Sequence, residues 1–422
     1  MSSGGAVALA YLASEYPAVS HTFILREIQQ LRQSGIAIRT ASIRPPLPGA
    51  GGFTEAESHE AAGTFYVKTR NPLRIVLDHA GCLLRRPFAY LAGLLLAFRL
   101  GGLDLKAVLY HLLYFIEAVV VGEWMRRNSL THLHVHFANA AATSALLLKR
   151  VYGIPYSITV HGSDEFYATD LYRLREKIAG ASFLRCVSKF CRSQLMKAGS
   201  PDDWGKMEVC PLGVDPDLFR PRRAPAGGAL HVMCVSRLVP AKGHTVLLAA
   251  MAILVKRGRR VHVDLVGDGP YRQAFESEAA RLMVAAHTTF HGSVNQHRVL
   301  ELLESADIFV LPSFAEGVPV CLMEAMAMEI PCVSTIIAGI PELIQSGKEG
   351  LLVPASDPES LASAVEMLMD DPELRFSLGR EGRRKIVESY NLRTNVERLV
   401  SIFERRLHFR MRAAEECTLD RA

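Results

Sequence analysis

The chain has 422 residues, of which 49% are hydrophobic and 22% charged, and its formal net charge is +5. A single hydrophobic core rarely organises so long a chain, so we expect two domains of roughly 200 residues each. The composition excludes a disordered or fibrous protein. The small positive charge suits anionic small molecules or an anionic membrane surface, and it does not require nucleic acid as a partner.

Eight cysteines are scattered along the chain without a CxxC pair. This pattern favours a reducing compartment over a disulfide framework. The first residues lack a basic stretch, and the apolar run at 6–12 is too short for the core of a signal peptide. We therefore expect a cytoplasmic protein.

Strand and helix patterns alternate through the first half of the chain, where we expect an N-terminal domain at 1–213. The apolar spacing from Phe23 to Leu31 predicts a helix that ends at Gly35. The expected strands of this half are apolar runs at 7–12, 36–43, 132–137, 156–160 and 183–187.

The region 73–127 is both apolar and basic. Its most hydrophobic stretch, 87–98, has twelve residues, whereas a membrane-spanning helix needs about 20. Basic residues beside apolar and aromatic ones suit a pair of interfacial helices on a membrane surface. The alternative is two long amphipathic helices packed on the domain core.

The proline- and glycine-containing segment 214–229 predicts an interdomain linker. A second α/β series follows at 230–394, then an amphipathic basic helix at 395–410 that can cross back to the first domain, and a tail at 411–422. The expected strands of the second series lie at 230–236, 261–266, 307–311, 332–335 and 351–353. Two such series predict two Rossmann-like, doubly wound parallel sheets that face each other across a cleft.

Two glutamates stand eight positions apart where a strand gives way to a helix. Gly317 and Pro319 open that helix, and the backbone N–H groups of a helix start can hold a diphosphate. Glu324, on the first turns, suits a ribose diol better than a phosphate, and Glu316 can face sugar hydroxyls. Taken alone, both could be ordinary surface glutamates.

Two cations and a histidine add to this pattern. Arg237 and Lys242 flank a proline turn at the end of the first strand of the second series. Fixed cations there can stabilise a diphosphate leaving group without a metal, although solvated loop cations are the alternative. His161, beside Gly162 at the end of another strand, is expected to lie in the cleft and to hydrogen-bond the transferred sugar.

The order of the motifs HGSD, GVDPDLF, SRLVPAKG, GDGP and E-x7-E resembles glycosyltransferase family 4, of the GT-B fold, over residues 5–405. The resemblance implies a retaining, metal-independent hexosyltransferase that uses a nucleotide diphosphate sugar, most often a UDP-sugar. The catalytic residues it implies are His161, Arg237, Lys242 and Glu316. The donor-binding residues it implies are Arg237, Lys242, Gly292, Ser293, Val294, Glu316, Gly317, Val318, Pro319 and Glu324.

The motifs SEYP with SHTFI, at 14–24, and HVHFANA, at 134–140, resemble exopolysaccharide members similar to colanic-acid glycosyltransferases. This narrower resemblance implies an exopolysaccharide acceptor, and the basic, apolar region at 73–127 suits a lipid-linked oligosaccharide at the cytoplasmic membrane face. The acceptor-side residues it implies are Ser20, His21, His136 and Asn139. Two alternatives stay open: a non-catalytic sugar-nucleotide-binding scaffold of a polysaccharide assembly complex, and a GT-B nucleotide-sugar epimerase.

Three further features bear on metals and stability. Asp215-Pro216-Asp217 is a DxD string, but its proline suits a turn better than a metal site. His132, His134 and His136 share one face of a predicted strand, where packed histidines are favoured over metal ligands. We therefore expect no metal or other cofactor. Family members often carry glycine where this chain has Glu329, which is expected to cost local stability.

Overall fold

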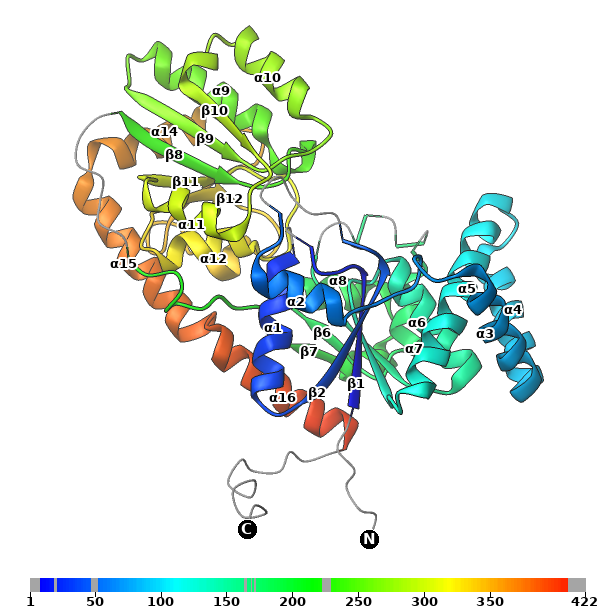
Figure 1. Cartoon of the computed structure of the whole chain (residues 1–422). Coiled ribbons are helices and arrows are strands. Elements are labelled where there is room, and N and C mark those ends of the chain that lie inside the picture. The colour runs from blue at the N-terminus through cyan, green and yellow to red at the C-terminus, as the bar shows by residue number, and fades with distance from the viewer. Residues whose placement is uncertain are drawn as a thin grey trace, which may run out of the picture.

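A computed structural model describes residues 8–18, 21–46, 52–162, 165–167, 169–170, 172–221 and 229–408. The chain has two β-sheets, and each lies in a domain of its own (Figure 1). The first sheet has the order β3-β2-β1-β4-β5-β6-β7, and all its strand pairs are parallel. Its strands are β1 (Ala8–Glu15), β2 (Ala37–Arg44), β3 (Phe65–Tyr66), β4 (His132–His136), β5 (Tyr156–Val160), β6 (Leu184–Cys186) and β7 (Met207–Val209).

The second sheet has the order β10-β9-β8-β11-β12-β13 and is also parallel throughout. Its strands are β8 (Leu230–Val235), β9 (Val261–Val266), β10 (Thr288–Gly292), β11 (Ile308–Leu311), β12 (Cys332–Thr335) and β13 (Leu351–Val353). In both sheets the strand order reverses beside the first strand, at β1/β4 and at β8/β11. Ligands of doubly wound sheets bind at the carboxyl ends of such strands. The predicted α/β fold is therefore confirmed, and it places the candidate site where the two switch points face each other.

Helices cover both faces of each sheet, so that most central strands are buried apolar runs. The helices of the first domain are α1 (Thr22–Gln33), α2 (Glu55–Gly63), α3 (Pro72–Arg85), α4 (Pro87–Gly101), α5 (Leu105–Arg127), α6 (Ala140–Tyr152), α7 (Leu174–Gly180) and α8 (Lys189–Ala198). Those that follow the linker are α9 (His244–Lys256), α10 (Arg272–Arg281), α11 (Gln296–Glu304), α12 (Val320–Ala327), α13 (Ile340–Leu343), α14 (Pro358–Asp370), α15 (Pro372–Ser389) and α16 (Leu392–Leu407).

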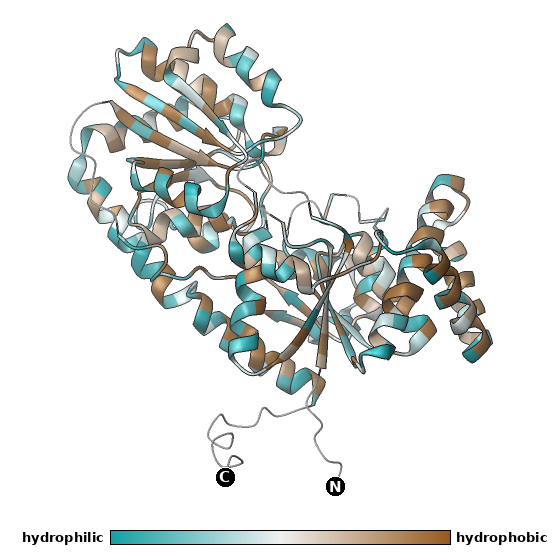
Figure 2. Cartoon of the chain, viewed as in Figure 1, coloured by the Kyte–Doolittle hydropathy of each residue, from teal (hydrophilic) through white to brown (hydrophobic). Residues whose placement is uncertain are grey.

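The prediction of two helices in region 73–127 is wrong, because three helices, α3, α4 and α5, form there. Pro87 starts α4 and bends it by 118° from α3, and Asp104 caps α5 after a glycine pair. Of the described helices, α5 is long and apolar enough to cross a membrane, but this is a statement of length and composition only. Of the most apolar 18-residue stretch of α5, 44% is buried inside the protein. The helix packs on α4 and α6 (Figures 1 and 2).

The last helix, α16, leaves the second domain and packs on the first one (Figure 1). Phe403 is fully buried there, with its ring 5.8 Å from that of Phe183 and 5.3 Å from that of His134. Arg406 donates from Nε to Glu208 on β7 over 2.8 Å. The C-terminal helix therefore forms part of the N-terminal domain's core.

Glu329 follows α12 in the left-handed region, with φ of 60°. A non-glycine residue in this conformation is strained by roughly 1–2 kcal/mol. Space is also short, since the backbone of Gly379 packs so closely that a Cβ there would lie 2.2 Å from the Glu329 carbonyl oxygen. The backbone at Glu329 therefore adopts the left-handed conformation that glycine adopts without strain.

We predict that Phe403→Ala destabilises the protein by about 3–5 kcal/mol, because it opens a cavity between α16 and the first sheet. Equilibrium urea denaturation measures this loss. Ser401→Ala, at an exposed position of the same helix, is the control and should change the stability by less than about 0.5 kcal/mol. Equal stability of the two variants would contradict the assignment of α16 to the core.

Candidate functional site

The loops after β8 and β11 meet through a partly buried ion pair. Lys242 donates from Nζ to Glu316 Oε1 over 2.6 Å, and the Ser313 hydroxyl donates to the same oxygen over 2.7 Å. The two loops are also joined by a backbone hydrogen bond of 2.8 Å from Phe314 to Ala241. The structure thus brings together two predicted residues, Lys242 and Glu316, and the serine fixes the carboxylate.

Two helix starts open at the same end of the second sheet. Neither α9 nor α12 has a side-chain cap. Gly243, before α9, has φ of 71°, and a Cβ there would lie 2.0 Å from the Pro312 carbonyl oxygen, so the position requires glycine. Uncapped helix starts carry partial positive charge and attract anions. This end of the sheet is suited to a phosphate group.

Glu324, on α12, is paired across the domain boundary. Arg26 on α1 donates from Nη1 to Glu324 Oε1 over 3.1 Å, and Gln296 donates to the same oxygen over 3.3 Å. Burial raises the pKa of Glu324, while Arg26 acts in the opposite direction. Gln296 opens α11 two residues after Val294, the last residue of the predicted segment 292–294. Arg26 gave no signal in the sequence, because its partner is 298 positions away.

His161 directly follows β5 and lies in an aromatic cluster. Its ring lies 4.3 Å from that of Phe137 and 5.1 Å from that of Phe23, and its Nε2 is 3.0 Å from His136 Nδ1. Burial holds the pKa of His161 well below its ordinary value. The imidazole of His161 is therefore neutral at physiological pH.

Two buried charged residues hold the loops around His161. Glu165 accepts the backbone N–H groups of His161 and Gly162 over 2.6 and 2.8 Å. Lys177 donates to the carbonyls of Ala138 and Asn139 over 2.9 and 2.8 Å. Burial raises the pKa of Glu165 to about 7 and lowers that of Lys177 to about 7. Only Glu165 had a sequence signal, since it directly follows the HGSD motif.

The predicted acceptor-side residues have unlike surroundings. The His21 ring lies 4.9 Å from that of Phe137, and burial, with Arg237 nearby, lowers the pKa of His21 to about 4. The side-chain oxygen of Asn139 accepts hydrogen bonds from Ala141 N–H and from the Ser14 hydroxyl, both over 3.1 Å, so it caps α6. Ser20 lies outside the described residues.

The two domains touch at the mouth of the site. A Cβ on Gly317 would lie 1.7 Å from the His161 carbonyl oxygen, and one on Gly162 would lie 2.4 Å from Gly317 Cα. On the same side, Glu342 accepts the N–H groups of Lys189 and Phe190, at the start of α8, over 2.9 and 2.8 Å. The carboxyl ends of the two sheets therefore meet backbone to backbone in this structure.

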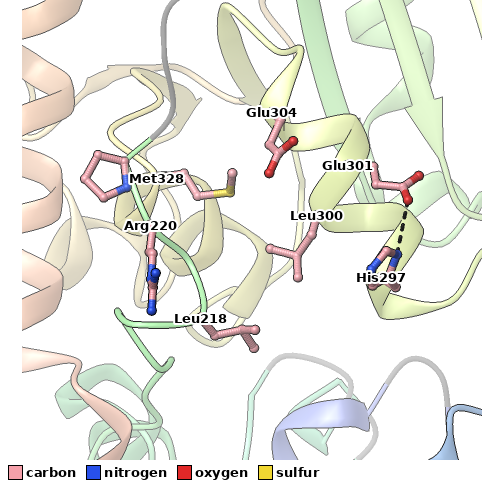
Figure 3. Close-up of a pocket in the computed structure, with 8 residues that line it drawn as sticks. Leu218, Arg220, His297, Leu300, Glu301, Glu304 and Met328 are labelled. Atoms are coloured by element: carbon pink, nitrogen blue, oxygen red, sulfur yellow. Dashed lines mark ion pairs between the residues drawn. The ribbon is translucent and has the colours of Figure 1, made fainter.

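A groove of about 680 Å³ lies elsewhere, between the linker and α11 (Figure 3). Glu301 and Glu304 line it, and Glu301 pairs with His297 over 3.1 Å. None of the predicted donor-site residues belongs to its lining. Arg220 also lines the groove, so its charged side chains are of both signs.

The side chains of the DxD string and of the β4 histidines, the two patterns that resemble metal ligands, form hydrogen bonds within the protein. In the DxD string, Asp215 accepts the N–H of Asp217 over 2.9 Å and forms a turn. On β4, both ring nitrogens of His134 bond hydroxyls, those of Ser157 and Thr159, over 2.7 and 2.8 Å. These contacts are those of a turn and of packed strand histidines.

Solved structures share this two-domain architecture. HepE of Anabaena in complex with UDP and glucose aligns with a TM-score of 0.71 over 94% of this chain and 99% of that chain, at 16% identity. The sucrose-phosphate synthase of Thermosynechococcus elongatus aligns with a TM-score of 0.73 over 95% and 99%, at 18% identity. The fold is that of the GT-B glycosyltransferases.

Family profiles and relatives narrow the class. Residues 95–218 match Glycosyltransferase Family 4, and residues 217–385 match the glycosyl transferases group 1. The D-inositol 3-phosphate glycosyltransferase of Arthrobacter sp. (strain FB24) is 30% identical over 303 residues, which are 66% of this chain and 70% of that protein. The chain belongs to the group 1 glycosyltransferases of family 4, as the motifs predicted.

Two other relatives differ in their named roles. WcaL of Escherichia coli (strain K12), a glycosyltransferase assigned provisionally to colanic acid biosynthesis, is 33% identical over 228 residues, 52% of this chain. The GDP-mannose-dependent alpha-(1-6)-phosphatidylinositol monomannoside mannosyltransferase of Mycolicibacterium smegmatis is 30% identical over 242 residues, 54% of this chain and 63% of that protein. The match spans about half the length of WcaL, or 55%.

We predict that Gly317→Ala separates the domains, because its methyl group would collide with the His161 carbonyl. Small-angle X-ray scattering of the ligand-free protein should show a larger radius of gyration than the wild type. Gly63→Ala is the control, since a Cβ there meets no atom within 4 Å. Superimposable scattering of all three proteins would show that this contact does not set the domain arrangement.

Proposed function

We propose that the chain is a retaining hexosyltransferase that moves a sugar from a nucleotide diphosphate sugar, most simply a UDP-sugar, onto an exopolysaccharide or lipid-linked oligosaccharide. One observation carries the proposal beyond family membership. Lys242 and Glu316 are paired between two uncapped helix starts, with Glu324 on the same helix as one of them. Anion-binding and hydroxyl-binding groups thus lie side by side, as a nucleotide sugar requires.

The donor is proposed to bind mainly to the second domain. Arg237, Lys242 and the α12 start, with the backbone at Gly317, Val318 and Pro319, would hold the diphosphate. Glu324 would accept hydrogen bonds from the ribose, and Gly292, Ser293 and Val294 would meet the nucleobase. Glu316 and His161 would bind the transferred sugar.

The chemistry is proposed to rest on leaving-group stabilisation. Fixed cations and helix starts aimed at the departing diphosphate stabilise charge that grows in the transition state. The acceptor hydroxyl would attack on the face that the diphosphate leaves, which retains the anomeric configuration. Positioning by the closed domains would supply much of the remaining rate enhancement. No metal or cofactor is assigned a step.

The nucleotide is the least constrained part of the donor. The mycobacterial relative is named as GDP-mannose-dependent, and the HepE structure holds UDP and glucose. The WcaL relative supports a polysaccharide acceptor by its named pathway. A non-catalytic sugar-nucleotide scaffold and a nucleotide-sugar epimerase remain the alternatives, and turnover separates them from a transferase.

A thermal-shift panel of UDP, GDP, ADP and their sugar conjugates, run with EDTA, tests the proposal. A ligand at 100 times its dissociation constant should add about 2.7 kcal/mol of stability. Glu324→Ala should weaken nucleotide binding about 10- to 100-fold, since it removes charged hydrogen bonds to the ribose. The exposed Glu304→Ala, in the groove of Figure 3, is the control.

Outcomes of this panel separate the alternatives. Stabilisation by one nucleotide family, with transfer to a glycan and a retained anomeric configuration by NMR, would support the proposed activity. Binding with no turnover would favour the scaffold, and conversion of the donor without an acceptor would favour the epimerase. No stabilisation by any nucleotide would overturn the donor site.

The α3–α5 region is proposed to contact the cytoplasmic face of the membrane. It holds 15 of the 26 exposed large hydrophobic side chains of the described residues, and Figure 2 shows how these helices project from the first domain. Leu84 and Phe88 are 83% and 86% exposed. Exposed Arg74, Arg99 and Lys106 add positive charge. An apolar surface with a basic rim suits an anionic bilayer.

We predict that Leu84→Glu with Phe88→Glu lowers binding to phosphatidylglycerol-containing vesicles at least about tenfold, because two apolar side chains no longer enter the bilayer. Vesicle co-sedimentation measures binding, with phosphatidylcholine vesicles for comparison. Phe376→Glu, a 51% exposed phenylalanine of α15, is the matched control. Equal binding by both variants would rule out this surface.

A further inference from the structure

A line of buried polar side chains runs from the core of the first domain to His161. Arg185 on β6 ion-pairs with Glu27 on α1. Glu27 Oε1 lies 3.4 Å from His136 Nε2 on β4, and His136 Nδ1 lies 3.0 Å from His161 Nε2. Arg185, Glu27 and His136 are each at most 2% exposed. The roles proposed above use neither Arg185 nor Glu27.

The first half of this line fixes a negative charge. Burial by itself would raise the pKa of Glu27, but the Arg185 guanidinium holds it well below its usual range. Arg185 is anchored by the carbonyls of Cys210 and Pro211, each over 3.0 Å. Glu27 is therefore an anion whose position beside His136 is set by the core.

The charge of Glu27 decides which nitrogen of His136, and then of His161, carries the proton. Glu27 Oε1 and His136 Nε2 do not form a hydrogen bond in this structure, but a negative charge 3.4 Å from Nε2 favours the neutral His136 tautomer that carries its proton on that nitrogen. The Nδ1 of that tautomer is an acceptor, so the proton shared with His161 belongs to His161 Nε2. A neutral His161 then has a bare Nδ1, and this atom is buried without a hydrogen-bond partner among the described residues.

We propose that Glu27 and His136 are positioning residues that hold His161 as the Nε2-protonated tautomer, with Nδ1 free to accept a hydrogen bond from a hydroxyl of the transferred sugar. The fixed anion also makes this nitrogen more electron-rich, which stabilises positive charge that develops at the anomeric carbon. This inference rests on the proposed transferase function. The phenylalanines on either side of His161 hold its ring in place.

A metal ion is the competing use of the same residues. Ligand atoms of Glu27, His134 and His136 lie within 4.8 Å of one another. Both nitrogens of His134 already bond hydroxyl groups, and the Arg185 guanidinium neutralises Glu27. A cation added here would face another cation in a buried setting. The contacts favour a line of polar side chains held by charge and hydrogen bonding over a metal site.

Long-range proton–nitrogen NMR of the ¹⁵N-histidine-labelled full chain reads the tautomers directly, with His161→Gln and His136→Gln for assignment. We expect wild-type His161 to carry its proton on Nε2. In Glu27→Gln, Arg185 would hold the amide oxygen, so the amide NH₂ would face His136 and reverse both tautomers. The kcat should fall about 10- to 100-fold, while KM for the donor stays within about twofold.

Glu60→Gln is the matched control, since Glu60 is also a buried carboxylate paired with an arginine, Arg32, but it lies outside the line. It should leave the His161 tautomer and kcat unchanged. A wild-type His161 protonated on Nδ1, a tautomer or kcat unaltered in Glu27→Gln, or stoichiometric zinc in the purified protein would each overturn the inference. Absence of transfer with every donor would instead contradict the proposed function, because the spectrum needs no turnover.

Discussion

The backbone contact between Gly162 and Gly317 is the constraint on which the rest of the site depends. It lets the loop after β5 and the loop after β11 approach so closely that no side chain fits at Gly317. His161 lies in the loop after β5 of the first domain and Glu316 in the loop after β11 of the second, so neither domain contains the candidate site alone. A displacement of about 1 Å can cost roughly 100-fold in rate, which makes this contact a sensitive point of the whole molecule.

The charged groups of the ligand-free cleft satisfy each other. Lys242 is paired with Glu316, and Arg26 with Glu324, so each of these two carboxylates faces a cation. A diphosphate would compete for Lys242, and a ribose would compete for Glu324. Binding in the proposed mode therefore exchanges one set of polar contacts for another, and its free energy is the difference between them. A ligand without a ribose or a diphosphate could not replace the polar contacts that it breaks, which favours specificity for nucleotide diphosphate sugars.

Local sequence patterns predicted the parts of the fold that rest on local physics. The strands β5, β9, β12 and β13 have the predicted bounds, because buried parallel strands are continuous apolar runs. The strands β3, β7 and β10 were missed, since they are short or lie at or near a sheet edge, where the apolar signal is weak. Glycine and proline marked the loops that carry Lys242 and Glu316. In contrast, Arg26, Glu27 and Arg185 act through partners 298 and 158 positions away, and no local pattern records such pairs.

The α3–α5 region, which carries the proposed membrane surface, is connected to the candidate site by packing contacts. The C-terminal end of α4 is held by Arg173, which donates from Nε to the Leu100 carbonyl over 2.8 Å. Arg173 directly precedes α7, the helix whose Lys177 fixes the carbonyls of Ala138 and Asn139 beside the histidine cluster. Leu103, in the turn after α4, is fully exposed. This turn is therefore linked, through Leu100, Arg173 and α7, to the carbonyls beside the histidine cluster. In the proposed function, membrane contact by the α3–α5 region would bring a lipid-linked acceptor to the first domain, while the donor is proposed to bind mainly to the second.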